Sequence, residues 1–300
     1  MPDLVIDARS ADLGGGFAVR RILPFRQRRM VGPFIFLDHA GPLNLPPDQL
    51  RRADVRPHPH IGLSTVSYLF DGAITHRDSL GVEQVIQPGA VNWMTAGRGI
   101  AHSERFDAPG SGAPGFEMIQ SWVALPDGDE ECAPAFDHYA AERLPVLEDA
   151  GVWARLIAGS AFGLTSAVRT NSPLFYLHVV LQPGATFGLP HDHAERAAYI
   201  AKGTVELEGQ SYSSGRMVVF GREERPTLTA TEPATIMLLG GEPLGERFIW
   251  WNFVSSRKER IEQAKADWKA GRIQLPPSDH AEFIPLPEER AKPARPEPLS

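Results

Sequence analysis

The chain has 300 residues, of which 42% are hydrophobic, and is therefore long enough for two modest domains or one large all-β body with a real core. Its formal net charge of -7 leaves no broad basic field, which argues against direct binding to nucleic acid. A single cysteine, Cys132, excludes an intramolecular disulfide framework and indicates a reducing, cytoplasmic compartment, and we expect neither a signal peptide nor a membrane segment.

Glycines and prolines, 28 and 27 in number, are spread along the chain and separate many short apolar runs. This pattern is typical of all-β sandwiches and barrels, with helix in the minority. The first buried strand is predicted over Phe34–Leu37 and ends at Asp38 and His39. Two interpretations of His39 stay open: it supports a metal site from behind the ligands, or it is satisfied by backbone groups at the strand end.

A polar, Pro-rich loop over residues 42–57 leads into the sequence HPH, which contains His58 and His60. Short strands then follow in quick succession, separated by turns that contain glycine. Pro88-Gly89 is typical of a type II turn, and another tight turn precedes the strand that carries His102 and Glu104. The strands predicted in this half cover residues 64–70, 73–76, 83–86, 91–94, 100–104 and 116–125.

Two pairs of possible ligands share the same spacing of two residues along a strand: His58 with His60, and His102 with Glu104. Such residues project from the same face, so both pairs can be directed at one point. Three imidazoles and one carboxylate form a donor set that suits iron, manganese, nickel, copper or zinc rather than calcium or magnesium. We therefore predict these four residues as metal ligands. The competing interpretation is a group of polar residues at a barrel mouth, bonded only to each other.

An internal repeat indicates a duplicated β-domain. QPGA occurs at residues 87–90 and again at 182–185, and HPH followed by YLFDG is matched by HDH followed by YIAKG. We place the first copy at residues 1–135 and the second at 136–300. The strands predicted in the second copy cover residues 152–158, 174–181, 198–201, 204–207, 217–220, 227–230 and 235–239.

The second copy has lost half of any metal site. When the turn glycines Gly89 and Gly215 are aligned, Leu228 and Ala230 stand at the places of the second ligand pair. The histidines of HDH, His191 and His193, are therefore interpreted as part of a polar loop. Glu195 is close enough in sequence to join them, which leaves a second, weaker site open.

A helix is predicted near the end of the chain, over residues 256–270. Ser256 and Glu259 have the spacing of a capping box, an apolar stripe follows, and Gly271 is a natural stop. The tail beyond it should be extended and mobile. Between the two copies, residues 126–134 read as an exposed link in which Cys132 is an ordinary thiol.

HPHIG, THRDSLG, NWMTAGRGIAHSE and QSWVALP together resemble the pirin family of the cupin superfamily, over most of the chain. The resemblance implies two cupin barrels in tandem, with one mononuclear non-haem iron in the first barrel. The family's ligands match His58, His60, His102 and Glu104 one for one. Many members carry an acidic residue shortly after HPH, where this chain has Ser64, and this implies a changed pocket polarity rather than a lost metal.

The resemblance implies a quercetin 2,3-dioxygenase, in which a flavonol binds the metal through its 3-hydroxyl and 4-carbonyl oxygens. Glu104 would accept the hydroxyl proton, dioxygen would attack, and the ring would open with loss of carbon monoxide. Proximity in sequence suggests Ile61, Leu63, Trp93 and Met94 for the pocket wall, although each also fits a plain core position.

Two alternatives need no catalysis: a metal- or redox-sensing regulator that acts through a protein partner, or a metal-binding cupin whose catalytic ability is a vestige. A cavity of at least roughly 300 Å³ beside the metal would favour the enzyme.

Overall fold

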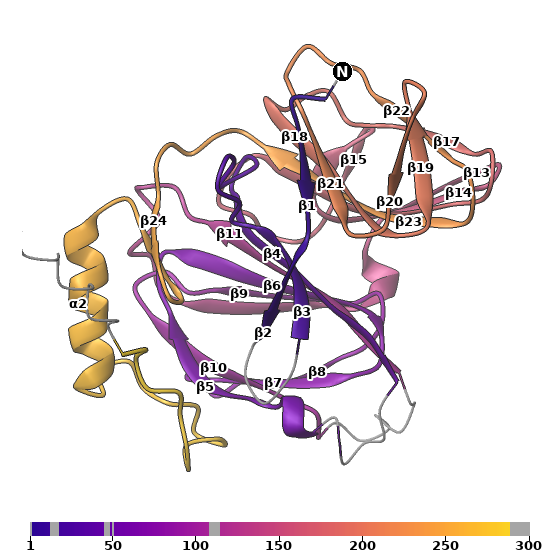
Figure 1. Cartoon of the computed structure of the whole chain (residues 1–300). Coiled ribbons are helices and arrows are strands. Elements are labelled where there is room, and N and C mark those ends of the chain that lie inside the picture. The colour runs from indigo at the N-terminus through magenta and orange to yellow at the C-terminus, as the bar shows by residue number, and fades with distance from the viewer. Residues whose placement is uncertain (1, 13–17, 45–48, 50, 108–114, 289–300) are drawn as a thin grey trace, which may run out of the picture.

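The computed structural model describes residues 2–12, 18–44, 49, 51–107 and 115–288 (Figure 1). Two bodies of antiparallel strands lie one above the other in Figure 1, and the helix α2 (Lys258–Lys269) lies beside the first. This is the expected arrangement of two β-barrels in tandem with a C-terminal helix. No helix among the described residues combines the length and the apolar character that crossing a membrane requires.

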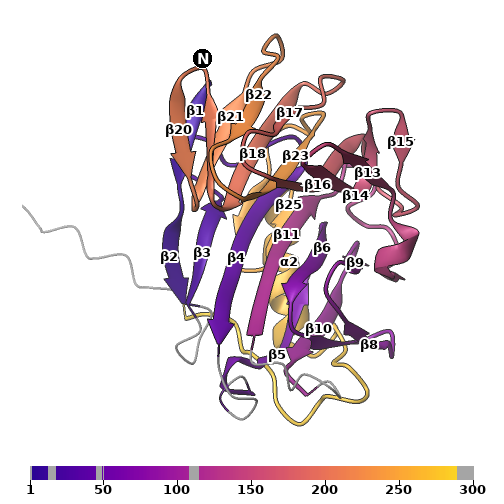
Figure 2. The same ribbon diagram turned by 90° about the vertical axis from the view of Figure 1, so that its right-hand side faces the viewer.

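The first barrel is built from a seven-stranded and a four-stranded sheet. The larger sheet has the order β12-β9-β6-β11-β4-β3-β2, and the smaller has the order β5-β10-β7-β8. Figure 2 shows β2, β3, β4 and β11 of the larger sheet side by side. The strands are β2 (Arg9–Asp12), β3 (Ala18–Leu23), β4 (Phe34–Asn44), β5 (Val55–His60), β6 (Leu63–Asp71), β7 (Ile74–Asp78), β8 (Glu83–Ile86), β9 (Val91–Thr95), β10 (Ile100–Arg105), β11 (Gly115–Ala124) and β12 (Ala135–Tyr139).

The second barrel repeats this plan. Its larger sheet has the order β1-β21-β18-β23-β16-β14-β13, with β15 paired to β14, and its smaller sheet has the order β17-β22-β19-β20. The strands are β1 (Leu4–Asp7), β13 (Val146–Asp149), β14 (Val152–Ala161), β15 (Leu164–Thr165), β16 (Leu174–Leu181), β17 (Thr186–Gly188), β18 (Glu195–Lys202), β19 (Thr204–Leu207), β20 (Gln210–Ser213), β21 (Arg216–Phe220), β22 (Thr227–Ala230) and β23 (Ala234–Gly241).

The two QPGA sequences form the same turn in both barrels. Gly89 and Gly184 have φ angles of 78° and 81°, in the left-handed region that favours glycine. In each turn the alanine N–H donates to the carbonyl of the glutamine, at 3.1 Å in the first copy and 3.0 Å in the second. These hydrogen bonds confirm the predicted turn at Pro88-Gly89.

Each end of the chain packs on the barrel that lies farther away in sequence. The N-terminal strand β1 pairs with β21 of the second barrel, with Leu4 opposite Val219. After the second barrel, the hairpin of β24 (Phe248–Trp250) and β25 (Phe253–Ser255) returns to the first barrel, where Val254 N–H donates to the Ile61 carbonyl at 3.2 Å. The domain boundary at residue 135 stays a prediction. β1 precedes this boundary but packs on the second barrel, whereas the β24–β25 hairpin follows it but packs on the first.

The interior of the second barrel is filled by apolar side chains. One hydrophobic cluster joins its two sheets, and Leu228 and Ala230 belong to this cluster with exposures of 0% and 1%. These are the residues that the alignment of the two copies places opposite the second ligand pair. The space that would hold a metal site is therefore occupied by packed hydrocarbon.

The capping box predicted at the helix start is wrong. The N-cap is Arg257, and no side chain caps the helix. Ser256 instead donates both its N–H and its hydroxyl to Glu130, at 2.7 and 3.2 Å. Glu130 is 2% exposed, so this part of the predicted exposed link is buried and anchors the start of the helix.

The predicted apolar stripe is confirmed: its residues Ile261, Ala264 and Trp268 are buried. The predicted tail beyond residue 288 lies outside the described residues.

Neither interpretation of His39 is correct. It lies within β4, is fully buried, and is bonded by side chains from both barrels. Its Nδ1 lies 2.9 Å from the Tyr199 hydroxyl, and its Nε2 lies 2.9 Å from Glu117 Oε1. The other oxygen of this carboxylate, Oε2, pairs with Lys202. His39 thus joins the two barrels and is not part of the predicted metal site.

A second histidine at this junction, His178, leads to a prediction about pH. Its Nδ1 lies 2.9 Å from the Tyr68 hydroxyl, and burial, together with Arg155 and Lys202, lowers its pKa from 6.5 to about 3. Folded His178 therefore stays neutral where the unfolded chain takes up a proton. We expect the free energy of unfolding to fall as the pH falls from 6.5, by about 2 kcal/mol near pH 5 from this residue.

His178→Gln keeps an acceptor for the Tyr68 hydroxyl but cannot titrate. Urea unfolding is measured near pH 7 and near pH 5. Between these two pH values, the free energy of unfolding should fall less for this variant than for the wild type. For the surface variant His191→Gln it should fall as much as for the wild type. Equal pH dependence in all three proteins would contradict the assignment.

Candidate metal centre

Three of the predicted ligands are brought together by the pairing of β5 with β10. The antiparallel register places His102 opposite His58 and Ile100 opposite His60. The ring centroids of His58 and His102 are 4.4 Å apart, and His60 lies 5.0 Å from each. One ring nitrogen from each residue falls within 4.8 Å of the others. We call His58, His60 and His102 the three-histidine cluster.

Hydrogen bonding leaves at least one nitrogen of each imidazole available. His58 Nδ1 donates to the Arg56 carbonyl at 2.9 Å, and His102 Nδ1 lies 3.3 Å from His76 Nδ1. His102 Nε2 and the ring nitrogens of His60 are buried and make no hydrogen bond of normal geometry within the described part of the chain, although the Asn252 backbone lies close to His60. Metal-bound histidines use one nitrogen for the metal and the other for a supporting group. The donor set therefore fits a transition metal ion.

Electrostatics favour the form of these histidines that binds metals. Burial lowers the pKa of His58 to about 4, and burial together with the neighbouring imidazoles lowers the pKa values of His60 and His102 well below the ordinary range. All three rings are therefore neutral at physiological pH. A neutral imidazole has the free lone pair that coordination requires.

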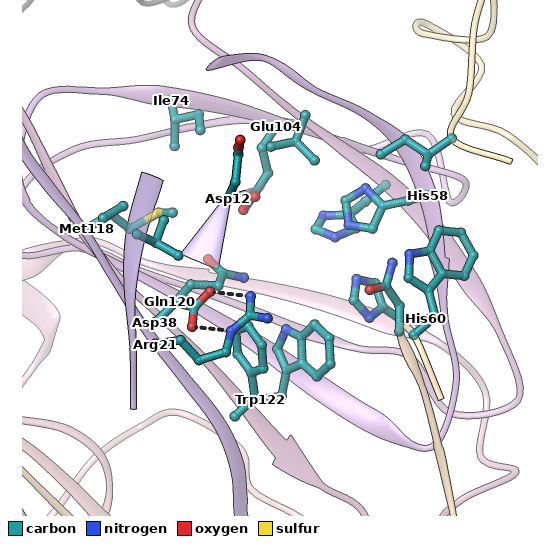
Figure 3. Close-up of a pocket in the computed structure, with 18 of the residues that line it drawn as sticks. Asp12, Arg21, Asp38, His58, His60, Ile74, Glu104, Met118, Gln120 and Trp122 are labelled. Atoms are coloured by element: carbon teal, nitrogen blue, oxygen red, sulfur yellow. Dashed lines mark hydrogen bonds and ion pairs between the residues drawn. The ribbon is translucent and has the colours of Figure 1, made fainter. Parts of the chain in front are cut away.

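Glu104 lines the same cavity but lies apart from the three-histidine cluster. The register of β10 against β5 shifts between His102 and Glu104, which moves the carboxylate along the cavity. Glu104 Oε1 accepts a hydrogen bond from the Ser67 hydroxyl at 3.2 Å, and burial raises the pKa of the carboxyl. In Figure 3 its carboxylate points into the cavity. Its role as a fourth ligand stays a prediction.

Sequence reasoning missed the pair behind His102. His76 Nε2 lies 3.0 Å from Asp78 Oδ2, and the His76 ring stacks on Phe136 with centroids 4.4 Å apart. Both residues lie on β7, beside β10, where Asp78 faces His102 and His76 faces Glu104. The signal was present, because His76 and Asp78 have the same two-residue spacing as the predicted ligand pairs. The pair orients the His102 ring from behind.

A cavity of about 400 Å³ adjoins the three-histidine cluster (Figure 3). Part of its wall is aromatic: the rings of Phe36 and Trp122 are stacked at 4.1 Å, and Trp122 meets His60 edge-on at 5.2 Å. Another part is polar, where Arg21 forms two hydrogen bonds with Asp38, at 2.9 and 2.8 Å. The other lining residues are Asp12, Val19, Pro24, Ala40, Val55, Ile74, Glu104, Phe106, Phe116, Met118, Gln120, Ile249, Trp251, Asn252 and Ile284.

The wall residues suggested by sequence proximity do not line this cavity. Ile61, Leu63, Trp93 and Met94 are each at most 1% exposed and belong to four separate hydrophobic clusters. They are core residues, in line with the alternative interpretation. The hydroxyl of Ser64 likewise bonds to Thr95 at 3.1 Å and does not line the cavity. The cavity wall comes instead from strands that are distant in sequence.

The histidines of the second barrel form no comparable group. His191 is 61% exposed, and His193 Nδ1 lies 3.9 Å from Glu242 Oε1. Among the described residues, only the three-histidine cluster gathers three or more potential metal ligands. The polar-loop interpretation of His191 and His193 is therefore favoured.

Comparison with known proteins places both barrels in one family. The Pirin family profile matches residues 16–123, and the profile of the Pirin C-terminal cupin domain matches residues 176–274. A pirin-like protein of Caulobacter vibrioides is 58% identical over 289 residues, which cover 96% of this chain and 100% of the relative.

Solved structures agree with the sequence profiles. A quercetin 2,3-dioxygenase from Acinetobacter baumannii superposes with a TM-score of 0.87 at 32% identity, covering 96% of each chain. A second structure of that name from the same organism gives a TM-score of 0.82 at 27% identity, covering 91% of this chain and 98% of the other.

Metal analysis of the purified protein tests the three-histidine cluster. We expect His58→Ala or His102→Ala to abolish the binding of divalent metal, because only two of the three imidazoles would remain. His191→Ala should keep the wild-type metal content, since His191 lies on the surface of the other barrel. A His191→Ala protein with half of the wild-type metal would show that the second barrel also binds an ion.

Proposed function

Since this chain belongs to the pirin family, we propose that it is a metal-dependent dioxygenase of the quercetin 2,3-dioxygenase type. The observation that carries the proposal is the cavity of about 400 Å³ beside the three-histidine cluster. Pockets that bind small organic ligands such as a flavonol have volumes of roughly 300 Å³ or more. A metal-binding protein that acts only through a surface contact needs no such space.

We assign the metal to His58, His60 and His102, with Glu104 as a fourth ligand, and iron(II) as the native ion. Manganese, nickel, copper and zinc are the alternatives that the same donor set accepts. The bound ion would act as a Lewis acid toward the flavonol 3-hydroxyl and 4-carbonyl oxygens and would supply the redox chemistry with dioxygen. The product would be the ring-opened ester, released together with carbon monoxide.

The contribution of the protein is proton transfer, orientation and exclusion of water. Glu104 lines the cavity, and the Ser67 hydroxyl at 3.2 Å holds one of its carboxylate oxygens. Its carboxylate would accept the hydroxyl proton of the flavonol. The stacked rings of Phe36 and Trp122 offer the planar substrate an apolar wall, while the Arg21–Asp38 pair is available to its peripheral hydroxyl groups.

Glu104→Gln separates proton transfer from metal binding. The amide keeps the shape of the carboxylate and an oxygen donor, so much of the metal should remain. It cannot accept a proton, so turnover should fall by roughly 100-fold or more. The measurement is metal content together with steady-state oxygen uptake, and turnover at the wild-type rate would refute the role of Glu104 as base.

The activity is tested by loading the protein with iron(II) without oxygen, checking its metal content, and adding quercetin in air. We expect oxygen uptake and carbon monoxide release in equal amounts, and neither in His102→Ala. A fully loaded protein that consumes no oxygen would contradict the proposal. It would favour the regulatory alternative, in which the metal state is transmitted to a protein partner.

A further inference from the structure

The segment that follows the second barrel is anchored beside the proposed ligands. Val254 N–H donates to the Ile61 carbonyl at 3.2 Å, next in sequence to His60. Ile284 N–H donates to the Pro57 carbonyl at 2.8 Å, next to His58. A third contact joins Arg105, next to Glu104, to Asp279 through two hydrogen bonds of 2.7 and 3.0 Å.

A glycine makes the first of these contacts sterically feasible. Gly62 has a φ of 66°, and a Cβ at this position would lie 2.0 Å from the Val254 carbonyl oxygen. Any other residue would push the β24–β25 hairpin away from the barrel. The close approach of the hairpin therefore depends on a glycine two residues after the HPH motif.

The tip of this hairpin forms part of the cavity wall. β24 and β25 are joined by a two-residue turn, with Trp250 paired to Phe253 and the turn formed by Trp251 and Asn252. Both turn residues line the cavity beside the three-histidine cluster, as does Ile284 from further along the segment. A part of the chain that lies beyond the second barrel thus helps to shape the pocket of the first.

Trp251 has a backbone conformation that is unfavourable for its residue type. Its φ is 52°, in the left-handed region where two-residue hairpin turns usually place asparagine or glycine. Bulky residues are rare there because the conformation is strained, and such strain often marks a functional position. The neighbouring tryptophan differs: Trp250 does not line the cavity and lies under Lys265 Nζ, 4.1 Å from its ring centroid.

We propose that Trp251 is a specificity-determining residue, whose indole stacks on a planar, polycyclic aromatic ligand in the cavity. This inference rests on the proposed function and assigns part of its substrate selectivity to the C-terminal segment. The indole supplies a large apolar face, and stacking on it favours extended flat ring systems over single rings or aliphatic chains. Stacking on the ligand would offset the cost of placing tryptophan where the backbone conformation favours asparagine or glycine.

The test measures the binding of quercetin, and of catechol as a single-ring probe, to the iron-loaded protein without oxygen. Trp251→Asn and Trp251→Gly remove the indole and suit the backbone, while Trp251→Phe keeps an aromatic ring. Trp250→Ala is the matched control in the same hairpin. Metal content and the midpoint of thermal unfolding are recorded for every variant.

We expect Trp251→Asn and Trp251→Gly to weaken quercetin binding by roughly tenfold, and Trp251→Phe by much less. Catechol binding and metal content should change little, and Trp250→Ala should bind quercetin as the wild type does. The midpoint of thermal unfolding reports the packing that is lost when the indole no longer meets Phe253, whose ring centroid lies 5.7 Å away. If wild type and Trp251→Asn bind quercetin equally, this inference is wrong and the proposed function stands. If the loaded wild type does not bind quercetin at all, the proposed function fails and this inference fails with it.

Discussion

The antiparallel register between β5 and β10 is the constraint on which the site depends. Because His102 stands opposite His58, two short motifs more than 40 residues apart bring their imidazoles to one point. A shift of one residue would turn every side chain of one strand to the other face. The surrounding structure supports this register: β7 supplies the pair that supports His102 from behind, and the C-terminal segment is bonded to Pro57 and Ile61 at the ends of the β5 motif and to Arg105 of β10.

The sequence predicted those features that depend on local spacing. Alternation along strands located the three histidines, the two QPGA turns showed the repeat, and Leu228 and Ala230 correctly indicated that the second copy carries no equivalent ligands. The pirin resemblance supplied the barrel architecture. In each case the decisive residues lie within one strand or one turn, where the chain geometry is nearly fixed.

Features that depend on contacts between distant segments were not predictable in this way. His39 was expected at a strand end, yet its partners come from β11 and the second barrel. Ser256 has the spacing of a capping residue, but its hydroxyl donates a hydrogen bond to the buried Glu130, 126 residues away, and does not cap the helix. The cavity wall was sought near the ligands in sequence, whereas the actual aromatic residues come from β4, β11 and the C-terminal hairpin. Tertiary contacts decided each of these positions.

The exchange of the two chain ends means that neither barrel is a self-contained module. A fragment that ends at residue 135 would lose the hairpin and helix that cover Ile61, and would leave β1 without its partner β21. The second barrel alone would expose the edge of β21 to pairing with other chains. Truncated or shuffled copies that divide the chain between the barrels therefore separate elements that pack on one another, so the unit that engineering can move intact is the whole two-barrel chain.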